Sequence, residues 1–206
     1  MRAWGERLSA AAGVGRLRWR AADIATALPD AEPHDLVTLA YVLDELAPEK
    51  RGPLLDGLWR LTADLLVIVE PGTPAGWQRI LAARARLLAA GAFVVAPCPH
   101  GAACPLHPPD WCHFAVHLAR SRRHRLAKAA ALSWEDEKFI YLAMSRQPVA
   151  PPAARVIARP QAGKGHVRLK LCRADGEAQQ RVASRREGED YRRARKLSWG
   201  SALMSQ

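Results

Sequence analysis

Residues 64–95, DLLVIVEPGTPAGWQRILAARARLLAAGAFVV, decide the fold of this chain. The stretch opens with an apolar run over 64–70, which is typical of a buried strand. Prolines and a glycine over 71–74 break that strand, and residues 75–90 have the length and composition of a helix that ends at Gly91. Residues 93–95 form another strand. A strand, a helix and a strand of these lengths predict a parallel α/β sheet.

The segments upstream of this stretch extend the same alternation. Residues 35–43 are a second buried-strand run, and residues 44–62 predict a loop followed by a helix. A short strand is expected over 16–20. Residues 1–12 predict an amphipathic helix that stops before Gly13. The upstream half therefore supplies further strands and helices to the same sheet.

Downstream of the third strand, the pattern predicts two more helical segments. Residues 111–128 are expected to be helical and basic on one side. Ser133 is the expected cap of a helix whose first turn is Glu-Asp-Glu over 135–137, where acidic residues suit the helix dipole. Residues 139–144 are apolar. Prolines at 148, 151 and 152 then mark a linker.

After the linker the apolar residues recur with a period of two. The runs 155–158, 166–172 and 178–184 predict an antiparallel meander that turns at 163–165 and at Asp175-Gly176. Residues 191–200 predict a basic helix or an extended arm. We therefore expect three segments: 1–96, 97–150 and 151–206.

Charge is unevenly distributed along the 206 residues. The net charge is +11, and residues 151–206 hold 13 Lys and Arg against 5 Asp and Glu. A basic tail favours RNA, DNA or another polyanion as partner. No run of eighteen apolar residues is present, so no membrane span is expected. We find no P-loop, Ser-His-Asp pattern or paired-carboxylate pattern, which leaves no catalytic residue to name.

Cysteines form the most informative cluster. Cys98, Cys104 and Cys112 lie within fifteen residues, in a loop rich in proline, and Cys172 is the remaining cysteine of the chain. Four cysteines are too few for a disulfide scaffold in a chain of this length, so a metal is the better interpretation. Four thiolates suit a tetrahedral zinc or an iron–sulfur cluster.

The α/β half resembles the middle of a class I S-adenosylmethionine-dependent methyltransferase. The resemblance rests on Asp23, on the strand from Asp35, and on the segment Tyr41-Val-Leu-Asp-Glu-Leu46. It implies that Asp23, Tyr41 and Leu43 line a cofactor cleft beyond the carboxyl ends of the strands. The first strand and the Gly-rich loop of that fold are not seen. We therefore expect an incomplete Rossmann-like core, with S-adenosylmethionine bound only by a longer form of the chain.

The rest of the chain carries short motifs of high specificity. They are CPHG at 98–101, CPL at 104–106, DWCHF at 110–114, EDEKF at 135–139, GHV at 165–167, LC at 171–172 and WG at 199–200. Together they are similar to the mitochondrial small-ribosomal-subunit assembly family, called methyltransferase-like protein 17 in animals, and its bacterial relatives. The resemblance covers essentially the whole chain.

This resemblance implies a [4Fe-4S] cluster held by Cys98, Cys104, Cys112 and Cys172. Zinc is the alternative, although the spacing C-x5-C-x7-C lacks the short C-x2–4-C pairs of common zinc sites. His100, His107 and His113 are alternative ligands in a mixed site. His113, between Trp111 and Phe114, is more simply a packing residue.

Two basic clusters are the expected contacts to ribosomal RNA. Arginine stacks on unpaired bases and forks onto phosphate groups. The residues are Arg120, Arg122, Arg123, Arg125 and Lys128 in the first cluster, and Arg192, Arg193, Arg195 and Lys196 in the second.

The function expected from these features is small-subunit ribosome assembly. The alternatives are an S-adenosylmethionine-dependent RNA methyltransferase and, more weakly, a redox or iron sensor. The expected compartment is a bacterial cytoplasm, with the mitochondrial matrix as the alternative.

Overall fold

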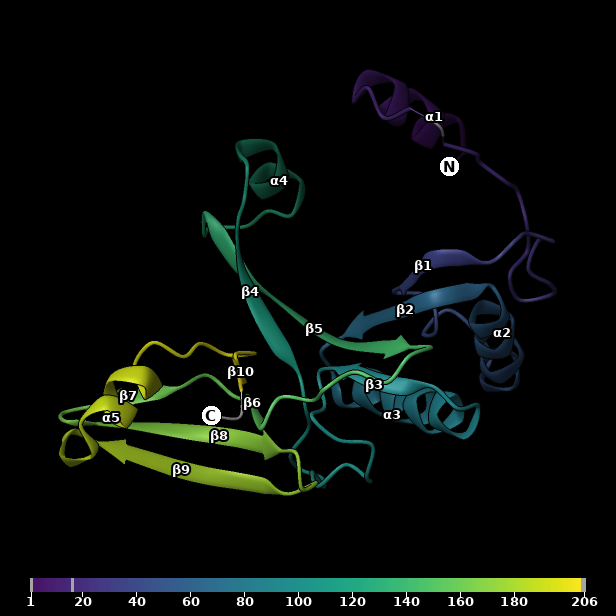
Figure 1. Cartoon of the computed structure of the whole chain (residues 1–206). Helices are drawn as coiled ribbons and strands as arrows, with labels where there is room; N and C mark the ends of the chain where they lie inside the picture. The colour runs from purple at the N-terminus through teal and green to yellow at the C-terminus, as the bar shows by residue number, and fades with distance from the viewer. Residues whose placement is uncertain (1, 16, 205–206) are drawn as a thin grey trace.

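The chain folds around two five-stranded sheets that follow one another in sequence (Figure 1). The computed structural model describes residues 2–15 and 17–204. The central sheet has the order β1-β2-β5-β3, and β4 also pairs with β5. Its strands are β1 (His34–Ala40), β2 (Thr62–Pro71), β3 (Phe93–Ala96), β4 (Phe114–Ala119) and β5 (Trp134–Ser145).

Two helices cover one face of the central sheet, α2 (Pro48–Arg60) and α3 (Pro74–Ala89). On β2, Leu66 and Ile68 are fully buried, whereas Leu65 and Val67, which alternate with them, are half-buried. This alternation identifies the face that packs against the helices. The strands and helices predicted over residues 35–95 are confirmed.

Helix α3 begins and ends where its sequence predicts. The Thr73 side chain accepts a hydrogen bond from the Gly76 amide at 3.0 Å, which caps the first turn. A Cβ atom on Gly76 would stand 2.0 Å from the Pro71 carbonyl oxygen, so the tight connection to β2 requires glycine there. Gly91 follows the helix with a φ of +81°.

The central sheet is mixed, which corrects the prediction of a parallel sheet. β1 and β2 are parallel, but β5 runs antiparallel to β2, β3 and β4. β5 therefore has β2 on one side and β3 and β4 on the other, and all three run in the opposite direction to it. The apolar run 139–144 indicates a strand, but its direction depends on the route the chain takes to reach it.

The helical prediction for 111–128 is wrong over most of its length. Residues 114–119 form β4, and helix α4 covers only Arg122–Ala127. β4 and β5 pair antiparallel from Phe114 opposite Phe139 to Ala119 opposite Trp134. The acidic residues over 135–137 therefore lie in β5, and not in a helix. Cross-strand pairing overrides the local helical pattern here.

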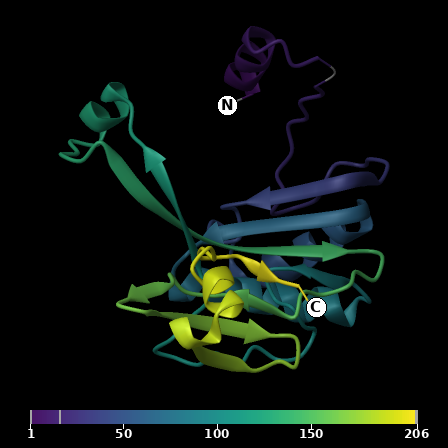
Figure 2. The same ribbon diagram turned by 60° about the vertical axis from the view of Figure 1, so that its left-hand side comes forward.

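The same pairing builds an arm, which we define as β4, α4 and residues 134–138 of β5. Figures 1 and 2 show the arm extending beyond the rest of the central sheet with α4 at its tip. Ser121, and not Ser133, caps a helix in this region, since its hydroxyl accepts from the His124 amide at 3.1 Å.

The N-terminal segment lies apart from the central sheet (Figure 1). Helix α1 spans Arg2–Ala11 and ends before Gly13, whose φ is +66°. The expected strand over 16–20 is wrong for residues 17–20, which are irregular, and position 16 lies outside the described residues. From 2 to 15 and from 17 to 204, no helix combines the length and apolar character needed to cross a membrane.

The C-terminal sheet confirms the predicted meander. Its order is β10-β6-β8-β7, with β9 on the other side of β8. The elements are β6 (Ala154–Val156), β7 (Gln161–Gly163), β8 (His166–Arg173), β9 (Ala178–Ser184), the short 3-10 helix η1 (Arg185–Glu187), α5 (Glu189–Ala194) and β10 (Ala202–Leu203). The turns contain Gly165 and Gly176, both with positive φ. Val167, Leu169 and Leu171 pack against Tyr191 and Ala194 of α5 in a core of their own.

Candidate metal centre

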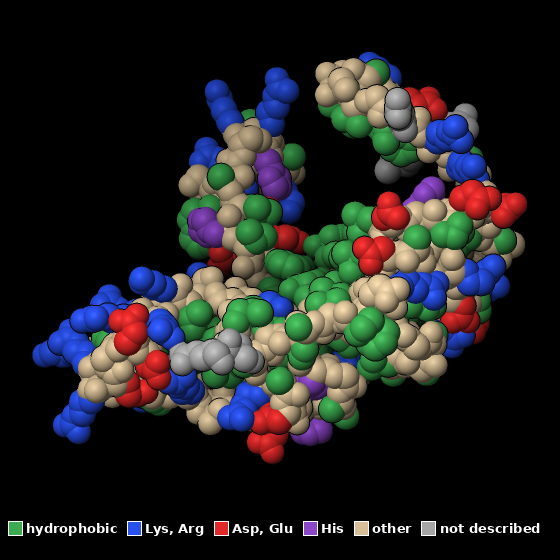
Figure 3. Space-filling model, in the orientation of Figure 1, with side chains coloured by type: hydrophobic (Ala, Val, Ile, Leu, Met, Phe, Trp, Pro, Cys, Tyr) green, Lys and Arg blue, Asp and Glu red, His purple; other side chains and the backbone are tan. Residues whose placement is uncertain are grey.

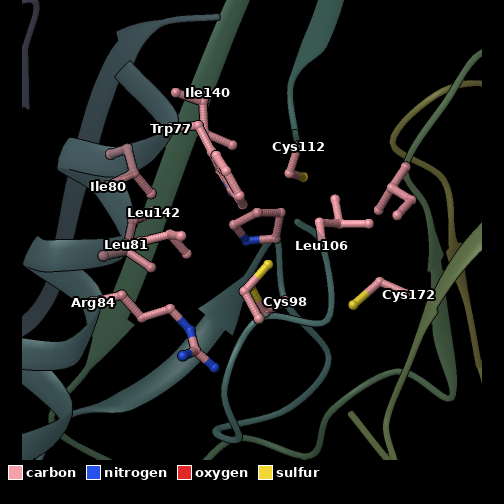
Figure 4. A pocket seen from close by; sticks show the side chains of 13 residues that line it. Trp77, Ile80, Leu81, Arg84, Cys98, Leu106, Cys112, Ile140, Leu142 and Cys172 are labelled. Atoms are coloured by element: carbon pink, nitrogen blue, oxygen red, sulfur yellow. The ribbon is translucent and has the colours of Figure 1, made fainter. Parts of the chain in front are cut away.

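All four cysteines line one pocket between the two sheets. Cys98, Cys104 and Cys112 belong to the loop over 97–113, which joins β3 to β4 and is called the cysteine loop below. Cys172 lies near the end of β8. Figure 4 shows Cys98, Cys112 and Cys172 around Leu106, with α3 on the opposite side. Residues far apart in sequence thus meet, as the predicted shared site requires.

The register of the central sheet positions the cysteine loop. β3 pairs with the end of β5 and β4 pairs with its beginning, on the side of β5 away from β2. The loop therefore leaves and rejoins the sheet along a single edge. Prolines at 97, 99, 105, 108 and 109 limit its conformations, which lowers the entropy cost of holding three thiols together.

Two buried or half-buried arginines hold this loop. Arg84 of α3 is 5% exposed, and its Nη2 atom donates to the carbonyl oxygens of His100 at 2.7 Å and Ala102 at 2.8 Å. Arg155 of β6 donates from Nε to the Pro97 carbonyl oxygen. Both guanidinium groups also lie close enough to Cys98 and Cys172 to lower the pKa of these two thiols.

Further contacts tie the loop to β8. His100 is buried, and its Nε2 atom lies 3.3 Å from the Cys172 sulfur. Lys170 of β8 donates from Nζ to the Asp110 carboxylate in the loop. The loop is therefore anchored to α3 by Arg84 and to the C-terminal sheet by these two pairs.

Burial favours the protonated form of three of the thiols. Burial raises the pKa of Cys98 and Cys112, and it raises the pKa of Cys172 to about 12, with the neighbouring thiolates adding to the effect. Arg84 and Arg155 oppose this rise in the pKa of Cys98 and Cys172. A metal centre that replaces the thiol protons would relieve the cost of burying thiolates.

The donor set fits a sulfur-ligated centre. Besides the four thiols the pocket is lined by apolar side chains and Arg84, with no Asp or Glu from the described part of the chain. Its free volume is about 20 Å³, room for about one water molecule. A cluster therefore requires the loop side chains to move outward. Over residues 2–15 and 17–204, no set of three or more His, Cys, Asp or Glu side chains is placed to hold a metal ion.

The histidines of the loop differ in their surroundings. His113 stacks on Trp111, with ring centroids 5.1 Å apart, and meets the edge of Trp199 at 4.8 Å. It is a packing residue, as the sequence indicates. His107 is exposed. His100 is the histidine that contacts a cysteine in the described structure.

The three residues assigned to a cofactor cleft have separate roles. Leu43 is 1% exposed and packs inside the main core. Tyr41 is 44% exposed and has a φ of 57° at the end of β1. The Asp23 carboxylate bonds the Thr26 hydroxyl and the Ala25 amide, and these bonds lower its pKa. The side chains of Asp23 and Leu43 are thus engaged within the protein itself.

The two predicted basic clusters lie on different parts of the molecule. The first is on the arm, and the second is on α5 and the two residues that follow it (Figure 1). Glu135 pairs with Arg120 at 2.6 Å and with Lys128 at 3.5 Å. Arg122 and Arg123 are exposed and pair with no carboxylate of the described chain. Both arginines are therefore available to an anionic partner.

On α5 the charges are also partly compensated. Glu189 lies 3.4 Å from Arg192 and 3.7 Å from Arg193. Arg195 lies over the Tyr191 ring, 5.9 Å from its centroid. Lys196 is exposed. The second cluster therefore offers fewer unpaired cations than its sequence indicates.

Arg84 and Arg155 were not identified from the sequence. For Arg84 a signal exists, because Trp77, Ile80 and Arg84 form one stripe at helical spacing on the buried face of α3. A charged residue at a core position of an amphipathic helix points to a buried partner. Arg155 carries no comparable signal, since its role depends on how the two sheets pack.

Comparison with known proteins agrees with the resemblance seen in the motifs. The chain is 34% identical to the human mitochondrial ribosome assembly protein METTL17 over 190 residues, which covers 82% of this chain and 39% of that protein. It is 27% identical over 216 residues to the mitochondrial Rsm22-cox11 tandem protein 2 of Schizosaccharomyces pombe, with 82% of this chain and 29% of that protein covered. The chain thus spans well under half the length of these relatives. A family model described as mitochondrial small ribosomal subunit Rsm22 matches residues 1–204, and the chain belongs to that family.

Proposed function

We propose that this chain acts in assembly of the small ribosomal subunit, binds ribosomal RNA, and holds a [4Fe-4S] cluster on Cys98, Cys104, Cys112 and Cys172. One observation carries the proposal: the four cysteines, from a loop and from a distant strand, line a single buried pocket with an arginine beside them. The names of the relatives support the assembly role.

The cysteines are proposed to act as a link between the two sheets. The cysteine loop belongs to the edge of the central sheet, and Cys172 belongs to the C-terminal sheet. Ligands from both sides close a long chain loop and restrain the unfolded state. A bound cluster supplies a compact anionic centre with four sulfur links, and Arg84 and Arg155 offset its charge.

Zinc remains the alternative for the same four ligands. A four-iron cluster is much larger than a single ion. The four sulfur atoms that bind one tetrahedral ion are therefore closer to each other than the four that bind a cluster. The thiols share a pocket but are not placed around a single ion in the described residues, so the preference for the cluster rests on the spacing C-x5-C-x7-C and on the family resemblance.

The arm is proposed to contact RNA through its tip. Arg122 and Arg123 project from α4, and Leu126 is 72% exposed beside them. Trp134, which is 40% exposed, lies against His117 with the two rings tilted and their centroids 4.6 Å apart. Arginines without a carboxylate partner among the described residues, and an exposed aromatic ring in the same arm, suit phosphate contacts and base stacking.

The relatives are named as mitochondrial proteins, and this supports a mitochondrial setting for the present chain. The comparisons offer no specific support for the bacterial cytoplasm. An RNA methyltransferase is the alternative activity. We do not favour it, because Leu43 is buried in the core and Asp23 is occupied by its own turn.

Anaerobic purification with a visible spectrum and with iron, sulfide and zinc assays tests the proposal. Broad absorbance near ~400 nm with about four irons per chain is expected of a thiolate-ligated cluster. One zinc in a colourless protein would replace the cluster by a structural ion. A folded protein without metal would disprove the proposal that the four cysteines hold a metal centre. Binding to a labelled small-subunit RNA fragment tests the other half of the proposal.

A further inference from the structure

A second pocket, on the C-terminal sheet, is rich in positive charge. It has a volume of about 150 Å³ and lies against β7, β8 and β9. Its polar lining consists of Arg159, Arg168, Lys170, Gln161 and Gln180. No carboxylate from the described segments lines it. We call it the cationic pocket.

The alternation of β8 places this pocket on the sheet face that α5 leaves open. Val167, Leu169 and Leu171 point toward α5 and are buried. Arg168 and Lys170 therefore point the other way, and so does Cys172. Side chains on one face of β8 therefore line both pockets. Lys170 lines the cationic pocket, and Cys172, two residues further along, lines the pocket of the four cysteines.

Charge on the two faces of this sheet is unequal. On the α5 side, Arg181 pairs with Asp190 at 3.1 Å. On the open face, the charge of Lys170 is balanced by Asp110 of the cysteine loop. Arg159 and Arg168 are exposed, and neither has an ion-pair partner among residues 2–15 and 17–204. Figure 3 shows Lys and Arg side chains gathering toward the outer end of this sheet.

We propose that Arg159 and Arg168 bind phosphate groups of an RNA backbone in the cationic pocket. This contact surface belongs to neither basic cluster recognised in the sequence, and it rests on the proposed function because RNA is the ligand. Each guanidinium presents a planar fork of donors that matches a phosphate. The Gln161 and Gln180 amides add neutral donors and acceptors of the kind that contact sugar and phosphate oxygens.

The position of the pocket links RNA binding to the cysteine loop. Asp110 lies between Cys104 and Cys112 and holds Lys170 by an ion pair. Lys170 lines the cationic pocket. The loop that carries three thiols therefore also fixes one wall of the RNA site.

The test uses the full chain with its metal and a double variant, Arg159→Glu with Arg168→Glu. Binding to a fluorescent small-subunit RNA fragment is measured from ~50 to ~200 mM salt. We expect affinity to fall about tenfold or more, and the slope of log K against log salt to fall by about 1.5, as for two lost phosphate contacts. Lys50→Glu with Arg60→Glu on α2 is the control with the same charge change, and it is expected to retain more of the affinity.

The outcomes separate this inference from the proposed function. If the wild type binds RNA and the Arg159/Arg168 variant keeps its affinity and salt slope, the cationic pocket is not the site and RNA binding stands. If both double variants lose the same amount of RNA affinity, the loss is explained by the change in net charge alone, and the inference is also overturned. A wild type that binds no RNA overturns the proposed function and this inference together. Iron content and circular dichroism of each variant confirm that it is folded.

Discussion

His100 and Cys172 are in contact although they are 72 positions apart: His100 Nε2 lies 3.3 Å from the Cys172 sulfur. The contact joins the cysteine loop to β8 directly at a proposed ligand. The backbone of His100 is at the same time held by Arg84 through a 2.7 Å hydrogen bond to its carbonyl oxygen. One residue therefore connects α3, the loop and the C-terminal sheet.

The contact predicts a role for His100 in retaining the metal. His100→Ala removes a hydrogen bond to a ligand sulfur, and outer contacts of this kind are commonly worth about 10- to 100-fold in metal affinity. We expect iron to be lost to a chelator faster by about that factor, as followed by the decay of visible absorbance. His107→Ala, in the same loop but exposed, is the matched control. Equal decay of both variants would show that the contact does not support the centre.

Replacing one cysteine is expected to remove the centre. Cys98→Ser or Cys172→Ser leaves three thiols, and the protein should lose its colour and melt at a lower temperature, because the link between loop and strand is gone. Metal analysis and thermal unfolding of the two variants measure both effects. Variants that keep wild-type metal content and melting temperature would disprove a shared site.

Arg84 is expected to be a main determinant of stability. Its Nη2 atom donates to two loop carbonyl groups, and hydrogen bonds to a charged group are worth about 1.5–3 kcal/mol each. Arg84→Leu should lower the free energy of unfolding in urea by about 3 kcal/mol. Arg86→Leu on the same helix removes an exposed pair with Asp56 and should change stability little. Similar losses of stability from the two substitutions would show that the Arg84 hydrogen bonds to the loop do not stabilise the fold.

The metal-free protein should lose stability as the solution becomes alkaline. The pKa of Cys172 is raised from 9.0 in the unfolded chain to about 12 in the fold, chiefly by burial. The unfolded state therefore releases its proton first, so this contribution is fully present below pH 9 and is lost as the pH rises toward about 12. Urea unfolding at a series of pH values measures the slope, and Cys172→Ala should make it shallower. If Cys172→Ala leaves the dependence of stability on pH unchanged, burial does not raise the pKa of the Cys172 thiol.

The tip of the arm is expected to bind RNA. Arg122→Glu with Arg123→Glu reverses two exposed charges that have no carboxylate partner in the described part of the chain. It should weaken binding to a small-subunit RNA fragment about tenfold, with a reduced salt slope. Stability should not change, because α4 buries no residue among those described. Anisotropy titrations measure the affinity, with Lys50→Glu and Arg60→Glu again as control. Full affinity in the arm variant would exclude the tip as a contact.

Local patterns in the sequence predicted much of the fold. The run over 64–95 identified β2, α3 and β3, and the period of two after the linker identified β8 and β9, because one face of each element must be buried. The cysteine set was also visible, since its members are all the cysteines of the chain.

The errors fall where pairing between distant residues decides the structure. Residues 114–119 carry a local helical pattern, yet they form β4 because Phe114 pairs with Phe139 and continues the edge of β5. The direction of β5 depends likewise on the route through the arm. No local signal in either segment specifies its partner strand.

The candidate site divides in the same way. The sequence by itself determined which side chains are available as ligands, because residue type sets the donor chemistry. Tertiary structure alone brought Cys172 to the loop and placed Arg159 and Arg168 together on an open sheet face, without an ion-pair partner among the described residues. It also buried Arg84 against two loop carbonyl groups. Proximity and charge balance depend on strand register and on sheet packing, which are set by long-range contacts and not by the residues next to each position.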